Sequence, residues 1–275
     1  MVAAKKSVTI ISAIVISLYV LWVAIPLVLV IFQSFRPRLL MFVDPPVFFF
    51  TPTTEHYIGI FSRQNILMFM RNSAIVGVFS TGLCLILGSM CAYALSTLKL
   101  PGKNFWALLI LLTRMVPAST LMVPIYVMMR TFGLLNTHTA IILTHATLNL
   151  PFTIWMMRSF FDDVPKELEQ AAMVDGCSRI LSFFKVAMPL AAPGLVATGI
   201  LAMLFSWNEF MFALILSSPR TRTLPIGISS FMGAVSVDWG GSSAAAVVAC
   251  IPVFIAGVIV QKYLVRGLTM GAVKG

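Results

Sequence analysis

The sequence predicts an all-α membrane protein with six transmembrane helices, both chain ends on the inner side and one helical loop exposed there. Of its 275 residues, 59% are hydrophobic and only 10% are charged, whereas soluble domains carry about 25% charged residues. The charges leave long runs free, and a helix crosses the hydrocarbon core with ~20 residues. These runs are apolar on all sides, whereas the strands of a membrane barrel alternate. The composition excludes a soluble enzyme, a disordered chain and a secreted disulfide scaffold.

The gaps between charges place the spans in order. The first span lies in a stretch without charged residues from Ser7 to Phe35. This stretch is longer than the 7–15 apolar residues of a removable signal peptide. The third is broken only by Arg114 and the fifth only by Glu209, and the others carry no charge. We expect one transmembrane domain over residues 1–275, with spans at about 8–34, 72–98, 104–129, 138–158, 188–216 and 241–262, and an inner loop at about 162–187.

The distribution of basic residues predicts the orientation. With the N-terminus inside, 11 Lys and Arg residues fall on the inner side and 7 on the outer side, and Arg114 completes the 19. Every Lys falls inside, which fits the positive-inside rule. The same rule explains the net charge of +10 without nucleic acid, because the basic residues form no stripe and no nucleic-acid-binding motif is present.

The inner loop is the most charged part of the chain. The 28 residues from Arg158 to Lys185 hold nine of the 28 charges, so this loop meets water or a soluble partner. Pro165 suits the first turn of a helix, Gly176 is a natural helix stop, and Ser178 can cap a second short helix. We therefore expect a helix–Gly–helix across the inner membrane surface.

Two faces follow from the helical spacing of this loop. The first helix places Leu168, Ala171 and Ala172 together, and the second places Ile180, Phe183, Phe184 and Ala187 together. A plain amphipathic interfacial loop and a docking element both fit these faces. The paired alanines favour docking, because small side chains let another surface approach closely.

The loop also carries a family pattern. Gln170, Ala171, Ala172, Gly176, Val186, Met188 and Pro189 stand where the EAA loop has E-A-A, three residues, G, nine residues and I-x-L-P. Gln replaces Glu, Val replaces Ile and Met replaces Leu. The stretch resembles the EAA loop of permease subunits in binding-protein-dependent ABC importers.

Further stretches resemble the carbohydrate-uptake branch of that family. They include Asn72-Ser73, Ala92–Leu95, Leu100–Lys103, Gly133–Thr137, Trp207–Phe210, Leu224-Pro225 and Gly271–Gly275. The chain is similar over nearly its whole length to the second permease subunit of maltose-type and glycerol-phosphate-type importers. The resemblance implies a sugar, polyol or sugar derivative as cargo, carried by alternating access across a bacterial or archaeal cytoplasmic membrane.

The resemblance also implies partners. They are a second permease subunit, two ATPase subunits, an extracytoplasmic solute-binding protein, the small-molecule substrate and the surrounding lipid. In the family the short loop helix docks in a cleft on the ATPase. The chain has no G-x-x-x-x-G-K-[ST] loop, so we expect no enzyme activity and no cofactor on this chain, with ATP and Mg on the partner ATPase.

Six residues are predicted to couple the chain to the ATPase: Glu169, Gln170, Ala171, Ala172, Asp175 and Gly176. Because Gln170 replaces the family's Glu, either Gln170 or its neighbour Glu169 fills the ionic role. Gly176 should tolerate substitution least, since a side chain would clash at the turn if φ is positive.

Polar residues within the spans suggest a substrate path. An ionisable residue there is costly and functional by default, and the candidates are Arg114, Asn149, Asn208 and Glu209. Arg114 would meet substrate hydroxyls or an anionic group. The alternatives are a structural pair of Arg114 with Glu209 or with the partner permease, an interfacial position for Glu209, and a helix-interface hydrogen bond for Asn149.

Three other interpretations are weaker. The three histidines and four cysteines show no metal-ligand spacing, so no metal site is predicted. An ion-coupled secondary transporter would show acidic relays and repeat halves, but only Glu209 is an acid within a span. A membrane-embedded enzyme would need clustered His, Asp or a Ser–Lys pair at membrane depth, and none stands out.

Overall fold

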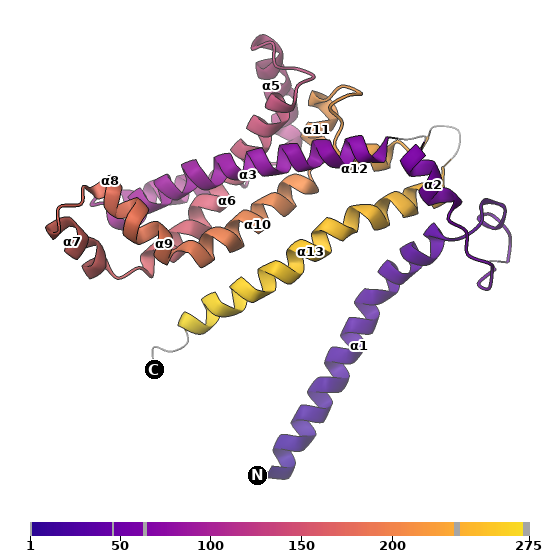
Figure 1. The fold of residues 1–275 in the computed structure, drawn as a ribbon, viewed down its shortest axis with the longest axis horizontal. Helices are drawn as coiled ribbons and strands as arrows, with labels where there is room; N and C mark the ends of the chain where they lie inside the picture. The colour runs from indigo at the N-terminus through magenta and orange to yellow at the C-terminus, as the bar shows by residue number, and fades with distance from the viewer. Residues whose placement is uncertain (1, 46, 63–64, 234–236, 272–275) are drawn as a thin grey trace. The chain divides into compact units, whose positions relative to one another are not determined.

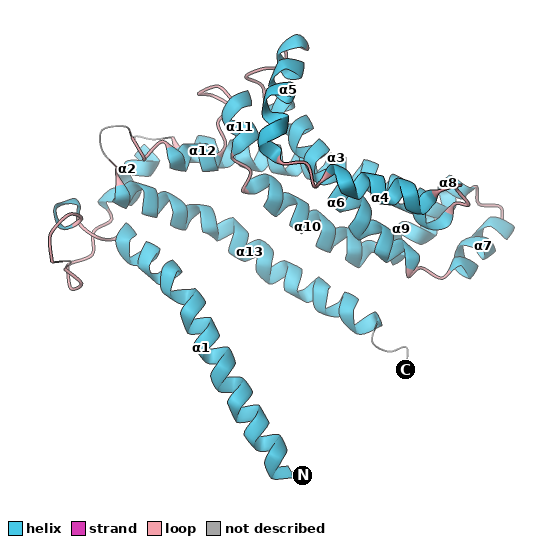
Figure 2. Ribbon diagram, turned by 180° about the vertical axis from the view of Figure 1, so that it is seen from behind, coloured by secondary structure: helices cyan, strands magenta, loops and turns pink. Residues whose placement is uncertain are grey.

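The computed structural model describes residues 2–45, 47–62, 65–233 and 237–271. Within these ranges the chain is helical, and β-pairing is limited to one isolated bridge between Met232 and Val237 (Figure 1, Figure 2). Residues 272–275 of the C-terminal family stretch lie outside the described residues, as does Arg63 of the orientation count.

The helices follow one another along the chain with short connections. They are α1 (Val2–Ser34), η1 (Arg38–Leu40), α2 (Glu55–Ser62), α3 (Ile66–Thr97), α4 (Lys103–Thr113), α5 (Ala118–Thr131), α6 (His138–Asp162), α7 (Lys166–Val174), α8 (Arg179–Ser182), the π-helix η2 (Phe183–Ala187), α9 (Met188–Leu190), α10 (Ala192–Trp207), α11 (Met211–Leu216), α12 (Leu224–Ser229) and α13 (Trp239–Gly271).

In the part of the chain that the structure describes, four helices are long and apolar enough to cross a membrane, in the stretches Ile10–Ser34, Ile66–Thr97, His138–Asp162 and Trp239–Gln261. Two further pairs of consecutive helices are long and apolar enough to cross a membrane only when each pair is taken together, and each pair is bent. Lys103–Thr113 and Ala118–Thr131 meet at 89°, and Arg179–Leu190 and Ala192–Trp207 meet at 77°. Counting each bent pair as one broken span gives up to six.

Prolines explain where the two pairs bend. Pro117 precedes α5 and Pro193 lies in the first turn of α10. A proline donates no backbone hydrogen bond and disfavours helical geometry in the residue before it. The predicted spans at 104–129 and 188–216 therefore contain two helical segments or more, and the second is interrupted again between α10 and α11.

Residues 1–66 and 228–251 form one compact unit. In it, His56 donates from Nε2 to the carbonyl oxygen of Arg36 at 2.8 Å. The guanidinium of Arg38 lies 3.6 Å from the carboxylate of Asp238. These contacts tie the segment after α1 to α2 and to the start of α13.

Residues 67–227 and 252–275 form the second unit, which holds the predicted sites. Here α6 packs against α4, α10 and α11, and α11 also packs against α5. One core cluster of this unit, the loop-side core, joins α3, α4 and α6 to the inner loop. It consists of Ala92, Tyr93, Leu95, Ala107, Ile154, Met157, Phe161, Val164, Phe183, Ala187 and Ala191.

Candidate functional sites: the inner loop and a polar cavity

The inner loop folds as a helix, a glycine turn and a second helix. α7 begins after Pro165 and ends at Val174. Gly176 has φ +91°, and Cys177 donates to the carbonyl of Ala172 at 2.9 Å, which closes a Schellman turn. Ser178 caps α8 by accepting from the backbone N–H of Leu181.

The reason for a glycine at position 176 differs from the expected clash. A Cβ atom added at Gly176 would meet no other atom within 4 Å, so space is not limiting. The positive φ is a conformation that other residues reach only at a cost in backbone energy.

The second helix continues directly from α8 into η2 and divides the expected aromatic face. Phe183 and Ala187 are buried in the loop-side core, whereas Ile180 and Phe184 are 73% and 56% exposed. One part of this face therefore anchors the loop, and the other part is open.

α7 likewise has an open face and an anchored face. Leu168, Ala171 and Val174 are exposed, Ala172 is half-buried, and Val174 keeps 87% of its surface accessible. Glu169 points the other way and is only 4% exposed. The exposed apolar row makes up the open face of α7. Gln170 is also exposed, and it lines a cavity together with Tyr93 and Glu169.

Two carboxylates of the loop region bind hydroxyl groups of α3. Tyr93 donates from its hydroxyl to Glu169 at 2.5 Å, and Ser96 donates to Asp162 at 2.5 Å. The loop is therefore joined to α3 by polar contacts as well as by the loop-side core. Glu169 is therefore buried against α3, whereas its neighbour Gln170 is exposed.

A cavity of about 760 Å³ lies between α4, α5, α6 and α10. Three of the four predicted substrate-path residues, Arg114, Asn149 and Glu209, line it. Asn208 does not; it is exposed at the end of α10, and its side chain donates to the carbonyl of Leu204 at 2.8 Å.

Arg114 stands at the bend between α4 and α5. Its guanidinium carbon lies 5.3 Å from the ring centre of Phe152 and 4.9 Å from that of Phe205, close enough for cation–π attraction. No carboxylate within the described ranges forms an ion pair with it, so the expected structural pair with Glu209 is absent there. The cation is therefore held by aromatic faces and by the carbonyl oxygen of Leu148, to which it donates at 3.5 Å, beside an open volume.

Asn149 is buried at 7% exposure on the cavity wall. Its side-chain amide forms no hydrogen bond to another residue that the structure describes. The helix-interface bond considered for it is therefore not seen, and the amide faces the cavity.

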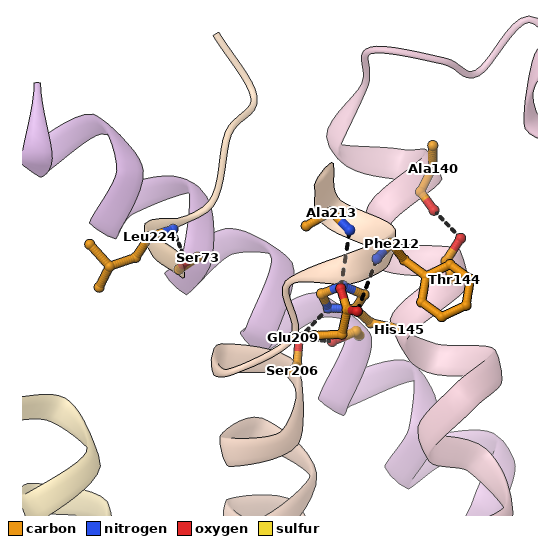
Figure 3. Close-up of polar contacts among 10 residues, drawn as sticks. Ser73, Ala140, Thr144, His145, Ser206, Glu209, Phe212, Ala213 and Leu224 are labelled. Carbon is orange, nitrogen blue, oxygen red and sulfur yellow. Dashed lines mark hydrogen bonds and ion pairs between the residues drawn. The ribbon is translucent and has the colours of Figure 1, made fainter. Parts of the chain in front are cut away.

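The half-buried Glu209 belongs to a polar network with the buried His145 and Ser206 (Figure 3). Its carboxylate lies 3.0 Å from Nε2 of His145 and accepts from the backbone N–H groups of Phe212 and Ala213 at 3.0 and 3.1 Å. The other ring nitrogen of His145 lies 2.7 Å from the hydroxyl of Ser206. Glu209 therefore pairs with α6 and caps the first turn of α11, which explains why the span breaks at this point.

The partners of these residues were not predicted from the sequence. Tyr93 stood out only as part of a family stretch, and Phe152, Phe205 and Ser206 were not singled out. A tyrosine within an apolar span carries a hydroxyl that usually needs a partner, and that signal was available at Tyr93.

Comparison with known proteins shows which family the chain belongs to. The model of the family "binding-protein-dependent transport system inner membrane component" matches residues 84–270. The chain belongs to this family. It is a multi-pass permease subunit of an ABC importer in the inner membrane, and such a permease works with partner subunits, an ATPase and a binding protein.

Relatives match over nearly the full chain. The sulfoquinovosyl glycerol transport system permease protein SmoH of Agrobacterium fabrum is 41% identical over 252 residues, which is 91% of this chain and 88% of SmoH. The trehalose/maltose transport system permease protein MalG of Thermococcus litoralis is 33% identical over 275 residues, 98% of each chain. The ion-coupled transporter considered above has no support among these relatives.

A solved structure shows the same fold. A chain of a bacterial ABC transporter involved in the import of the acidic polysaccharide alginate superposes with a TM-score of 0.80 at 23% identity. The match covers 94% of this chain and 97% of that one. The bent helix pairs thus occur in a fold that is shared with importer permeases.

Proposed function

We propose that this permease pairs with a second permease subunit and two ATPase subunits and receives its cargo from an outer solute-binding protein. ATP and Mg act on the ATPases, and their closure drives alternating access through the paired permeases. In this arrangement both chain ends and the inner loop face the cytoplasm.

The observation that carries the proposal is the open face of α7. Apolar side chains exposed on a water-facing helix mark a contact surface. α7 packs against α8 and η2, and Phe183 and Ala187 of η2 belong to the loop-side core together with residues of α3, α4 and α6. A partner that moves α7 therefore moves membrane helices. Of the six predicted coupling residues, Gln170, Ala171, Ala172, Asp175 and Gly176 form the docking side and its turn, and Glu169 anchors the helix from behind.

The proposed cargo is a sugar, polyol or sugar derivative, including anionic derivatives. SmoH and MalG are named for the transport of sulfoquinovosyl glycerol and trehalose/maltose, respectively. The cavity beside Arg114 supports this class, because it offers a cation, the amide of Asn149 and the carboxylate of Glu209 to hydroxyl-rich molecules. Asn208 stays a proposed contact at the end of the path.

A pull-down tests the docking of the ATPase. The tagged chain is co-expressed with its partner permease and ATPase, and wild type is compared with Gly176→Asp and with the control Gly59→Asp. Both glycines have open space where a Cβ atom would be added, but only Gly176 has a positive φ. We expect the ATPase to co-purify with wild type and Gly59→Asp and to be lost from Gly176→Asp.

Two results would contradict the proposal. If the Gly176→Asp variant retains the ATPase at the wild-type level, the inner loop is not part of the interface with the ATPase. Purification of the chain alone, with reconstituted vesicles that move solute down an ion gradient, would replace the importer with a secondary transporter.

A further inference from the structure

We infer that Tyr93 and Ser96 form a two-point clamp that makes α3 follow α7, so that α3 carries the movement of the loop to the opposite end of the membrane domain. This inference rests on the proposed docking of an ATPase on α7. The α3 clamp consists of the hydrogen bonds Tyr93–Glu169 and Ser96–Asp162.

The clamp grips one face of α3 at two levels. Tyr93 and Ser96 are three residues apart, so their side chains lie above one another on the helix surface. Asp162 is the last residue of α6 and Glu169 lies in α7. The two acceptors therefore flank the connection between α6 and α7, and a displacement of this segment pulls on both hydroxyls.

The Tyr93 contact has little exposed surface and lies at the wall of a cavity of about 860 Å³ that Tyr93, Ser96 and Glu169 line. Tyr93 and Glu169 are 7% and 4% exposed, and the tyrosine ring lies 5.7 Å from Phe161 and 4.8 Å from Phe183, measured between ring centres. A hydrogen bond to a carboxylate is stronger than a neutral one, and burial among aromatic rings strengthens it further. The link therefore resists extension when α7 moves.

The far end of α3 holds another segment. Asn72 donates from its amide to the carbonyls of Arg220 and Arg222, both at 2.9 Å, and Leu224 donates from its backbone N–H to Ser73 at 2.8 Å. From Asn72 to Tyr93 is 21 residues, or about 32 Å of helix at ~1.5 Å per residue. In Figures 1 and 2, α7 and α8 lie at one end of α3 and α11 lies toward the other.

α3 is suited to transmit movement because it is one unbroken helix without proline. The other long apolar helices contain a proline inside, namely Pro26 in α1, Pro151 in α6 and Pro252 in α13. α3 has none over its 32 residues. Sharp kinks arise at prolines and at Gly/Ser pairs, and the Gly88-Ser89 pair of α3 lies inside an unbroken helix. We infer that α3 moves as one unit between the clamp and the segment around Arg220–Leu224.

The test measures coupling separately from assembly. The complex is reconstituted in lipid nanodiscs with its binding protein, and ATPase activity is measured with and without solute-loaded binding protein. Tyr93→Phe and Ser96→Ala each remove one clamp hydroxyl. Tyr126→Phe removes a tyrosine hydroxyl that has no hydrogen bond within the described chain, and Ser89→Ala removes one that is buried without a partner there.

We expect Tyr93→Phe to keep the ATPase bound and the basal activity unchanged, while stimulation by the loaded binding protein falls about tenfold. Ser96→Ala should reduce stimulation less, because the carboxylate of Asp162 is half-exposed, so that water can donate hydrogen bonds to it. Both controls should behave as wild type. Wild-type stimulation in Tyr93→Phe would overturn the clamp, whereas no stimulation in the wild type itself would overturn the proposed importer.

A double variant separates transmission from stability. Tyr93→Phe alone leaves a buried carboxylate unpaired, whereas Tyr93→Phe with Glu169→Leu removes both partners and should unfold near the wild-type temperature. The clamp predicts that the double variant stays uncoupled. Recovery of both stability and stimulation in the double variant would show that the bond is only structural and would overturn the inference.

Discussion

Two glutamates of this membrane domain, the buried Glu169 and the half-buried Glu209, are held in opposite ways. Glu209 has three partners, the imidazole of His145 and two backbone N–H groups. Glu169 has one partner among the described residues, the hydroxyl of Tyr93. A carboxylate with several fixed donors locks its surroundings, whereas one held by a single side chain on another helix joins two elements that can still move. The first arrangement suits a fixed point and the second suits a link.

The network at Glu209 extends through three helices. Ser80 on α3 donates to Ser206 on α10 at 3.1 Å, and Ser206 lies beside His145 on α6. Ser206 in turn donates to Nδ1 of His145, and Nε2 of His145 donates to Glu209. Each of these side chains therefore has a hydrogen-bond partner. A network whose members are all satisfied rigidifies a core.

The largest effect is expected from breaking the Glu209 network. Glu209→Leu leaves the Nε2–H of His145 and two backbone N–H groups without their acceptor, and each buried donor left unsatisfied costs about 1–3 kcal/mol. Thermal unfolding of the detergent-solubilised complex should show a marked loss. Glu209→Gln keeps an acceptor for the N–H groups and should lose less. If the Glu209→Leu complex unfolds at the wild-type temperature, Glu209 is not the fixed point that distinguishes it from Glu169.

Breaking the single hydrogen bond of Glu169 should lower stability less than breaking the Glu209 network does. It should lower the coupling between the ATPase and transport more. Glu169→Leu removes one hydrogen bond to a charged group, worth about 1.5–3 kcal/mol. Uptake of radiolabelled solute into vesicles should fall further than the unfolding temperature suggests, while Glu169→Gln, which still accepts from Tyr93, keeps most uptake. Equal uptake in the Leu and Gln variants would contradict this prediction.

The inner loop was predictable because its signals are local. Pro165, Gly176 and Ser178 each mark a helix boundary within a few residues, and the structure places all three at such boundaries. The family pattern then added the docking role. The reason for the glycine was less accessible, since open space around a residue cannot be read from its neighbours in sequence.

The cavity network was not predictable in the same way. His145 and Glu209 lie 64 positions apart on different elements, so no local pattern joins them. Arg114 and Glu209 had opposite charges and were natural candidates for a pair. The break between α10 and α11 instead turns the carboxylate toward α6, and the 89° bend places Arg114 against two aromatic rings.

Arg114 offers a third kind of charge, one without an ionic partner within the described ranges. Cation–π contacts at partly exposed sites contribute about 0.5–1 kcal/mol, so Arg114→Met should change stability by less than ~1 kcal/mol. If the cation meets cargo, uptake should fall about tenfold, and more for an anionic sugar derivative than for a neutral one. Unchanged uptake of both would remove Arg114 from the path, and Arg130→Met, on the same bent pair outside the cavity, serves as the control.

The smallest effect is expected at Asn208. Its side chain makes one bond within its own helix end and is exposed to solvent, so Asn208→Ala should shift stability by about 0.5 kcal/mol or less. Uptake kinetics decide its role, because a raised KM with unchanged unfolding would keep Asn208 on the substrate path. Unchanged kinetics would confine the path to the cavity residues.

The most direct test of the central claim is a cross-link from the open face of α7. A photoreactive residue at Ala171, which is exposed, is compared with one at Gly59 on α2, which is also open, in the assembled complex. Docking of the ATPase on α7 predicts an adduct between the permease and the ATPase from position 171 and none from position 59. An intact complex that yields no ATPase adduct from position 171 would contradict it.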